Sequence, residues 1–227
     1  MTSCRSTKIP STASANLPIS LNTPVDSACY SVGVNYGAGL RENMKTFPGG
    51  KANIDAIAEG FLRAIKGDSA ALVLTPEAAQ AYIQSYIAEI QVKETAAEKE
   101  KGERFLVENK TKEGVITTES GLQYKILKQG DGAKPVSEDQ VLVHYTGKLL
   151  DGTVFDSSVQ RGEPLTIGVG QVIKGWTELL QLMPVGSKYQ AWIPSDLAYG
   201  EQGAGQMIRP NTTIEFEVEL LDIVKEQ

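Results

Sequence analysis

The sequence contains very little histidine and cysteine, and these shortages exclude several kinds of enzyme. His144 is the only histidine, and Cys4 and Cys29 are the only cysteines among the 227 residues. There is no room for a serine–histidine–aspartate triad with spare histidine ligands, and no Cys/His cluster has the spacing of a zinc site. Two cysteines are also too few for a disulfide scaffold. We therefore expect neither hydrolase chemistry nor a metal centre.

A nucleotide-binding fingerprint is also missing. Gly168-Val169-Gly170 begins like one, but the third glycine is absent and no βαβ pattern surrounds it. The segment predicts a turn, and we expect no cofactor.

Positive charge and long apolar runs are scarce as well. The chain has 22 Lys and Arg against 28 Asp and Glu, a formal net charge of −6, which argues against nucleic acid as the main partner. No apolar run approaches the roughly 18 residues of a membrane span, and no apolar segment of a secretory signal follows Met1. The length and the ordinary apolar fraction of 41% suit two modest soluble domains.

The amino-terminal half changes character at about residue 25. Residues 1–24 are rich in Ser and Thr and predict a flexible leader. A helix capped by Asp26 or Ser27 should follow and end before Pro48. A second helix should begin after Asn53, with its apolar residues on one face, and end at Gly67.

The third segment predicts one long helix. Thr75-Pro76 is a favourable start, and the stretch from Lys93 to Asn109 consists mainly of strong helix formers with no apolar face. A helix from Pro76 to Asn109 would extend about 50 Å at 1.5 Å per residue. Gly114 should mark its exit, which gives a helical region over residues 25–112.

The period of the apolar residues changes from 3.6 to 2 after Gly114. The clearest case is the run 214–220, in which Ile, Phe, Val and Leu alternate with Glu. Such half-exposed strands are typical of an antiparallel sheet, and a short helical run from Val172 to about Leu180 would cover its apolar face. The fold class is therefore α+β, with residues 113–227 as the second domain.

Five motifs occur in order in this second domain. Taken singly, their apolar residues could simply form a core. They are Val143-His144-Tyr145-Thr146-Gly147, Asp151-Gly152-Thr153-Val154-Phe155-Asp156-Ser157-Ser158, Val172-Ile173-Lys174-Gly175-Trp176, Ile193-Pro194-Ser195-Asp196-Leu197-Ala198-Tyr199-Gly200 and Ile214-Glu215-Phe216-Glu217-Val218-Glu219-Leu220-Leu221. Together they resemble the FKBP family of peptidyl-prolyl cis-trans isomerases over essentially the whole chain from Gly121. The resemblance implies a twisted antiparallel sheet wrapped around a short helix, with the active pocket between them.

The resemblance also implies roles for individual residues. Trp176 would form the pocket floor, Tyr199 would place a hydroxyl over it, and Asp156 would form a polar edge beside Tyr145. Ile173 would offer its backbone N–H to a substrate carbonyl. The remaining walls and the overhanging loop would come from Phe155, Val172, Phe216, Met207 and Ile208. Two positions depart from the pattern of many members: Leu165 replaces an aromatic wall residue, and Ala204 replaces a loop histidine found in some. Both should alter sequence preference more than activity.

The amino-terminal half resembles the helical dimerisation module of bacterial Mip-like and FkpA-like isomerases. Lys112-Glu113-Gly114-Val115 followed by Ser120-Gly121-Leu122-Gln123-Tyr124 resembles their junction. The expected partners are proline-containing polypeptide clients and a second copy of the chain, with rapamycin-type macrolides as inhibitors. A monomeric helical cap remains the alternative to the dimer. A non-catalytic chaperone or scaffold remains the alternative to the enzyme.

The first residues of the chain give an indication of the cellular compartment of the protein. Met1-Thr2-Ser3-Cys4 before a polar tract resembles the end of a bacterial lipoprotein signal, with Cys4 as the lipid-bearing residue and the true start lying upstream. This predicts the bacterial envelope, in the periplasm or anchored by lipid, and membrane contact only if Cys4 is lipidated. The alternative is an incidental cysteine and a cytoplasmic protein.

Overall fold

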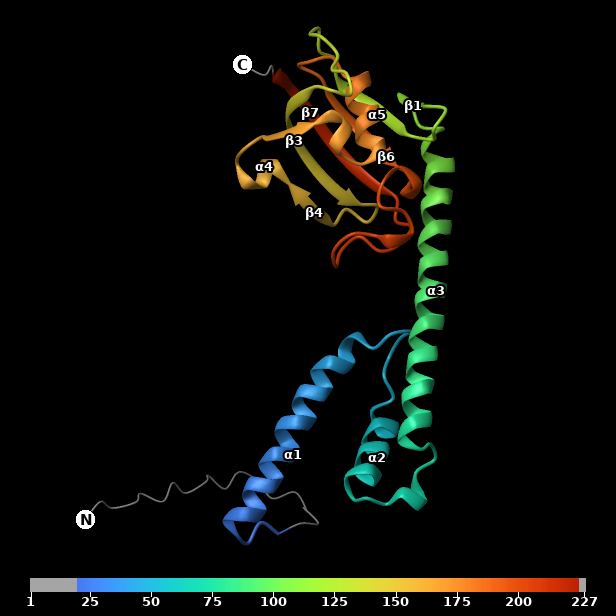
Figure 1. Cartoon of the computed structure of the whole chain (residues 1–227), viewed down its shortest axis with the longest axis vertical. Helices are drawn as coiled ribbons and strands as arrows, with labels where there is room; N and C mark the ends of the chain where they lie inside the picture. The colour runs from blue at the N-terminus through green and yellow to red at the C-terminus, as the bar shows by residue number, and fades with distance from the viewer. Residues whose placement is uncertain (1–19, 225–227) are drawn as a thin grey trace, which may run out of the picture. The chain divides into compact units, whose positions relative to one another are not determined.

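The computed structural model describes residues 20–224, which divide into two compact units (Figure 1). The first unit extends to Ile83 and the second begins at Gln84, so the division falls within a helix. None of the helices over residues 20–224 is both long enough and apolar enough to cross a bilayer. Cys4 and most of the expected leader lie outside the described residues.

The first unit opens with helix α1 (Pro24–Asn43), which starts slightly earlier than predicted. Thr23 is the N-cap: its side chain accepts a hydrogen bond from the Asp26 N–H, while the Asp26 carboxylate accepts one from the Thr23 N–H. The predicted cap at Asp26 or Ser27 is therefore wrong by a few residues, because Asp26 occupies the third helical position of a capping box. The 3₁₀ helix η1 (Met44–Thr46) ends this segment before Pro48, as predicted.

Helix α2 (Ile54–Ile65) is capped by Asn53 as predicted and is followed by the 3₁₀ helix η2 (Ser69–Ala71). Its apolar face is not covered within the first unit, because Ile54, Phe61 and Leu62 are 50%, 51% and 46% exposed. Of the described residues in this unit, only Ala52 is buried. The unit therefore presents apolar helices without a core of its own.

Helix α3 (Pro76–Asn109) has the predicted bounds. Its start is fixed by Thr75, whose hydroxyl accepts a hydrogen bond from the Ala78 N–H. Gly114 follows its end in the left-handed conformation, with φ = 79°, which glycine adopts without strain.

The second unit contains a seven-stranded antiparallel sheet. Its path runs β1-β2-β6-β7-β3-β4, and β5 pairs with the first half of β3. The strands are β1 (Val115–Thr117), β2 (Gln123–Lys128), β3 (Gln140–Leu149), β4 (Val154–Ser157), β5 (Leu165–Gly168), β6 (Lys188–Ile193) and β7 (Ile214–Val224). The helices are α4 (Ser158–Arg161), η3 (Val169–Gln171), α5 (Lys174–Leu182), η4 (Ser195–Leu197) and η5 (Gly200–Gln202).

The core of this unit lies between the sheet and α5, around which the strands curve (Figure 1). Alternate residues of β3 and β7 are buried, as the two-residue period predicted. From α5, Trp176, Leu179 and Leu180 fill the concave face. The predicted α+β class is thus confirmed. The helix starts at Lys174 rather than Val172, because Ile173 is an extended N-cap.

The last turns of α3 pack on the same sheet. Gln123 of β2 accepts a buried hydrogen bond from the Asn109 amide at 3.0 Å and donates to the Leu106 carbonyl at 2.8 Å. Phe105 contacts the ring of Trp192 on β6, with centroids 6.4 Å apart. This end of α3 is therefore tied to the sheet by buried polar and aromatic contacts.

Candidate active site

Four aromatic rings from four elements meet between α5 and the sheet. The Trp176 ring lies edge-on to Tyr145 and to Phe216, with centroids 5.3 and 5.1 Å apart. Phe155 lies edge-on to Phe216 at 5.5 Å. Edge-to-face contacts at these distances are favourable for aromatic pairs. The rings therefore support one another in fixed orientations.

Gly147 makes this cluster possible. It lies on β3 two residues after Tyr145 and opposite Phe216 on β7, so all three share one face of the sheet. A Cβ atom at Gly147 would lie 2.6 Å from ring atoms of both Phe155 and Phe216. The two rings thus occupy the space that any larger residue would need.

The rings line a cleft of about 470 Å³ that opens to solvent. Trp176 is only 5% exposed and forms part of its wall from the core side. Nine of the eleven predicted site residues line this cleft together: Tyr145, Phe155, Asp156, Leu165, Val172, Ile173, Trp176, Tyr199 and Phe216.

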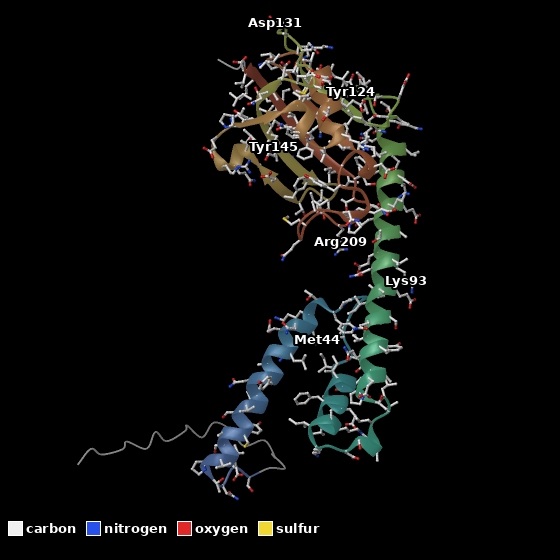
Figure 2. The ribbon with its side chains drawn as sticks, in the orientation of Figure 1. Met44, Lys93, Tyr124, Asp131, Tyr145 and Arg209 are labelled. Atoms are coloured by element: carbon white, nitrogen blue, oxygen red, sulfur yellow. The ribbon has the colours of Figure 1, made fainter. Side chains whose placement is uncertain are left out.

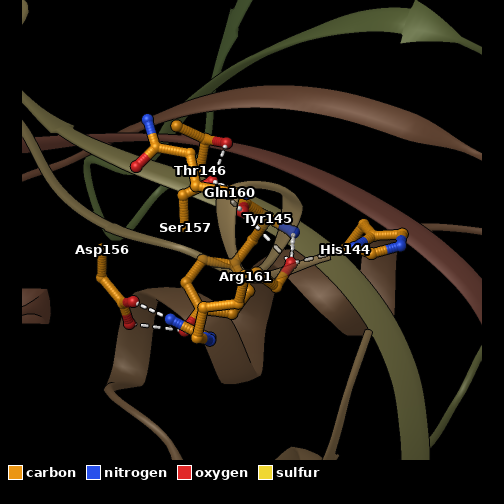
Figure 3. A network of polar contacts seen from close by, with 8 residues as sticks. His144, Tyr145, Thr146, Asp156, Ser157, Gln160 and Arg161 are labelled. Atoms are coloured by element: carbon orange, nitrogen blue, oxygen red, sulfur yellow. Dashed lines mark hydrogen bonds and ion pairs between the residues drawn. The ribbon is translucent and has the colours of Figure 1, made fainter. Parts of the chain in front are cut away.

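The polar edge of the cleft is a three-residue network (Figure 3). The Tyr145 hydroxyl donates to Asp156 at 2.5 Å, and Arg161 donates both to Asp156 and, at 2.9 Å, to the Tyr145 oxygen. Burial alone would raise the pKa of Asp156, but the hydrogen bonds from Tyr145 and Arg161 outweigh it and hold that pKa below its ordinary value. The carboxylate is therefore ionised at neutral pH.

Both tyrosines of the cleft stay neutral. Burial raises the pKa of Tyr145, and its hydrogen bond to Asp156 raises it further. Burial also raises the pKa of Tyr199, with a smaller contribution from the charge of Asp156. Within residues 20–224 the Tyr199 hydroxyl makes no hydrogen bond. It is thus a neutral donor beside the cleft.

His144 lies on the other face of β3 and supports the site only indirectly. Its Nδ1 atom lies 3.0 Å from the Ser158 hydroxyl, which also accepts a hydrogen bond from the Tyr145 N–H at 2.8 Å. Ser158 begins α4 and is fully buried. These contacts hold α4, and with it Arg161, against the strand that carries Tyr145.

Two predicted residues do not line the aromatic cleft. Ile208 is 7% exposed and lies in the core, paired through its backbone with Ala204. Met207 is 44% exposed and lines a separate cleft of about 390 Å³, together with Glu98 and Lys101 of α3. Side-chain directions in an irregular loop do not follow a fixed period, so the sequence could not separate these neighbours. Their substrate-binding role stays a prediction.

Three residues of the site were missed. Ile167 and Gln171 line the cleft, and Arg161 completes the polar network. Ile167 could have been found, because it lies two residues after Leu165 on the same strand face. Arg161 had no comparable signal, since the four-residue helix α4 was not predicted.

The cleft is mainly apolar, with a few groups that can form hydrogen bonds. Among the described residues that line it there is no Ser, Cys, His or Lys that could act as a nucleophile. It offers apolar walls and three groups that can donate a hydrogen bond: the Tyr199 hydroxyl, the Gln171 side-chain amide and the backbone N–H of Ile173. That N–H donates no hydrogen bond within residues 20–224. Such a site can hold a compact apolar ring and donate hydrogen bonds to carbonyls beside it.

Comparisons with known proteins agree with a site of this kind. The model of the FKBP-type peptidyl-prolyl cis-trans isomerase matches residues 132–221, and that of the domain amino terminal to FKBP-type peptidyl-prolyl isomerase matches residues 25–126. The outer membrane protein MIP of Legionella longbeachae is 41% identical over 91% of this chain and 88% of its own. The FKBP-type 22 kDa peptidyl-prolyl cis-trans isomerase of Escherichia coli is 46% identical over 84% of this chain and 94% of its own.

The crystal structure of FkpA from Escherichia coli is also similar, with a TM-score of 0.75 and 31% identity over 90% of this chain and 98% of that one. The chain belongs to the FKBP-type peptidyl-prolyl cis-trans isomerases. The predicted family and activity are thus confirmed. The enzyme accelerates rotation about the bond that precedes proline.

Proposed function

We propose that the aromatic cleft receives the proline ring of a polypeptide client, with Trp176 below the ring and Tyr145, Phe155 and Phe216 around it. Val172, Ile173 and Leu165 complete the apolar wall. The Ile173 N–H and the Tyr199 hydroxyl donate to carbonyls that flank the ring. In this proposal residues 113–227 form the isomerase domain, since every residue of the cleft falls within them.

Rotation in this site needs no covalent step. The X-Pro bond resists rotation with a barrier of about 18–20 kcal/mol, because the twisted amide loses its resonance. The planar amide has the larger charge separation and is better solvated by water. An apolar cleft therefore penalises the planar ground state more than the twisted state. The rest of the chain can then turn about the fixed ring, with Asp156 keeping the Tyr145 hydroxyl in place.

The observation that carries this proposal is the meeting of the four rings around an open cleft. We expect Trp176→Ala to lower kcat/KM on a proline tetrapeptide by more than tenfold, because it removes the floor. Tyr199→Phe and Asp156→Ala should each lower it by about two- to tenfold, because each removes hydrogen-bonding groups but leaves the apolar walls in place.

Tyr189→Phe is the matched control. Tyr189 is buried in the same sheet and also uses its hydroxyl, which donates to Gln129 at 3.2 Å, but it does not line the cleft. Its loss should leave kcat/KM unchanged. Wild-type kcat/KM in the Trp176, Tyr199 and Asp156 variants would contradict the proposal, provided that urea titration shows them folded.

We also propose that the first unit forms a homodimer. Its support is the uncovered apolar face of α2, where Phe61 is 51% and Ile65 is 69% exposed. An amphipathic helix normally buries such a face. Phe61→Glu should convert a dimer to a monomer in sedimentation equilibrium. Ala56→Glu should not, because Ala56 lies on the opposite face of α2.

One result would refute the dimer, and another would refute the interface on α2. A wild-type chain that sediments as a monomer at micromolar concentration would leave this face free for unfolded clients, as the chaperone alternative holds. An aggregation assay on the Phe61→Glu variant would then show weaker protection. A Phe61→Glu variant that still sediments as a dimer would place the interface elsewhere.

The remaining proposals concern inhibitors and location. A rapamycin-type macrolide should compete with proline peptides, because both would occupy the same apolar cleft. An envelope location is supported by the name of the Legionella relative, an outer membrane protein. If Cys4 carries lipid, Cys4→Ser should abolish incorporation of labelled palmitate in cells that express the full-length gene, and unchanged incorporation would refute this role. A chain found only in the cytoplasmic fraction would refute the envelope location.

A further inference from the structure

Gly102 is an unexpected residue in the middle of α3. The preceding residues, Lys99, Glu100 and Lys101, are strong helix formers, whereas glycine inside a helix costs about 0.5–1 kcal/mol relative to alanine. Gly102 is nevertheless buried, unlike most of this helix. A packing contact should therefore explain it.

That contact is with Thr213. A Cβ atom at Gly102 would lie 2.3 Å from the Thr213 hydroxyl oxygen and 3.1 Å from the Thr213 Cβ. Thr213 is itself only 4% exposed, so its side chain has little freedom to move away. The helix backbone thus lies directly against this residue, and only glycine allows so close an approach.

Thr213 is the last residue of the loop that follows Tyr199, a residue that lines the aromatic cleft. The loop begins at Gly200, next to Tyr199, and is closed by hydrogen bonds from Asn211 N–H to the Gly200 carbonyl at 2.8 Å and between Ala204 and Ile208. Ile208 anchors its inner side in the core. Its outer side faces α3, where Arg209 (Figure 2) lies 3.6 Å from Glu94 in an exposed ion pair.

If a side chain at residue 102 displaced Thr213, the loop before Thr213 would move more than the strand after it. Ile214 is paired with Leu149 of β3 and with Ile193 of β6, so the start of β7 is held on both sides. On the other side of Thr213 the loop forms no strand pairs with the sheet: it is held by the hydrogen bonds described above and by one from the Thr212 N–H to the Arg209 carbonyl at 3.3 Å. A side chain at residue 102 would push either the helix outward or Thr213 inward. Either movement would shift Gly200 and, with it, Tyr199.

We infer that Gly102 is a positioning residue for the isomerase reaction: its lack of a side chain lets α3 seat the loop 200–213 at the distance that places the Tyr199 hydroxyl over the cleft. Helix α3 is then part of the catalytic machinery as a support, although none of its residues lines the aromatic cleft. This inference rests on the role proposed for Tyr199.

The test is a set of variants of the full-length enzyme. Gly102→Ala should lower kcat/KM on a proline tetrapeptide by about five- to twentyfold, since a misplacement of about 1 Å at a site can cost up to a hundredfold. Glu103→Ala is the matched control: it changes the next, exposed residue of α3 and should have no effect. Adding Thr213→Ala to Gly102→Ala removes the clashing hydroxyl and should restore most of the loss.

A second comparison links the effect to Tyr199. Gly102→Ala should cost much less when combined with Tyr199→Phe, because the hydroxyl that it misplaces is already absent. A purely stabilising role for Gly102 would lower the denaturation midpoint, which Thr213→Ala could also restore, but it would not show this non-additivity.

Three outcomes would overturn the inference: wild-type kcat/KM in Gly102→Ala, no rescue by Thr213→Ala, or full additivity with Tyr199→Phe. Tyr199→Phe alone tests the proposed role of that residue. If it lowers kcat/KM while Gly102→Ala does not, only the positioning role fails.

Discussion

Replacing Gly147 by alanine should damage the active site more than the fold. The added Cβ would lie 2.6 Å from both Phe155 and Phe216, so each ring must retreat by about 0.8 Å to reach an ordinary 3.4 Å contact. Phe216 is only 4% exposed and already touches Trp176 and Tyr145, so the displacement would spread through the cluster.

The expected magnitudes follow from this geometry. Overpacking of one methyl group costs about 1–3 kcal/mol of stability, which a domain of this size can tolerate. Ring displacements approaching 1 Å in the cleft should lower kcat/KM by about ten- to hundredfold. The assay is tetrapeptide isomerisation by Gly147→Ala, with urea unfolding of the same sample to show that it is folded.

Two further variants test whether the Gly147 Cβ acts through the rings. In a Phe155→Leu background one of the two clashing rings is gone, so Gly147→Ala should cost distinctly less than in the wild type. Gly33→Ala is the control glycine, because nothing lies within 4 Å of the Cβ it would add. Unchanged kcat/KM in Gly147→Ala, or an equal loss in both backgrounds, would show that Gly147 does not set the position of the rings.

The other predictions concern the polar edge and the wall. Because the pKa of Asp156 is lowered and those of Tyr145 and Tyr199 are raised, kcat/KM should be constant from about pH 5 to 9, and a bell-shaped profile would contradict this. Because the pKa of Asp156 is lowered in the folded protein, its ionised carboxylate contributes to stability above the ordinary Asp pKa of about 4. That contribution is lost as the pH falls through the pKa of Asp156 in the folded protein, and acid unfolding would show the loss. Arg161→Met should raise the pKa of Asp156 toward its ordinary value in an NMR titration, because it removes the hydrogen bonds and charge of the guanidinium; an unchanged pKa would refute that role. Leu165→Phe should change the ranking of tetrapeptides that differ before proline more than their mean kcat/KM, and an unchanged ranking would show that this wall does not contact the substrate.

Local rules predicted most of the fold. The bounds of α3 follow from Thr75-Pro76 at one end and Gly114 beyond the other, and the strand β7 follows from strict alternation with glutamate. The cap of α1 was placed too late because two acceptable capping residues, Thr23 and Asp26, lie three apart and cooperate in one capping box. The structure shows that Thr23 is the boundary.

The candidate site was predicted less completely, for a different reason. Side chains on regular strands, such as Tyr145 and Phe216, point to the face of the sheet that the two-residue period predicts. Met207 and Ile208 lie in a loop whose path is set by tertiary contacts, and Arg161 lies on a helix of a single turn. Met207 and Ile208 were named from the family resemblance, which does not say which way their side chains turn, and nothing in the sequence singled out Arg161.

The cleft unites positions from Tyr145 to Phe216, and it closes only when β7 pairs with β3 and β6. A ligand of this cleft therefore binds the folded chain and finds no site in the unfolded one. At a hundred times its Kd it would stabilise the isomerase unit by about 2.7 kcal/mol. Melting curves can consequently report occupancy of the cleft for any compound, including those that no tetrapeptide assay can follow.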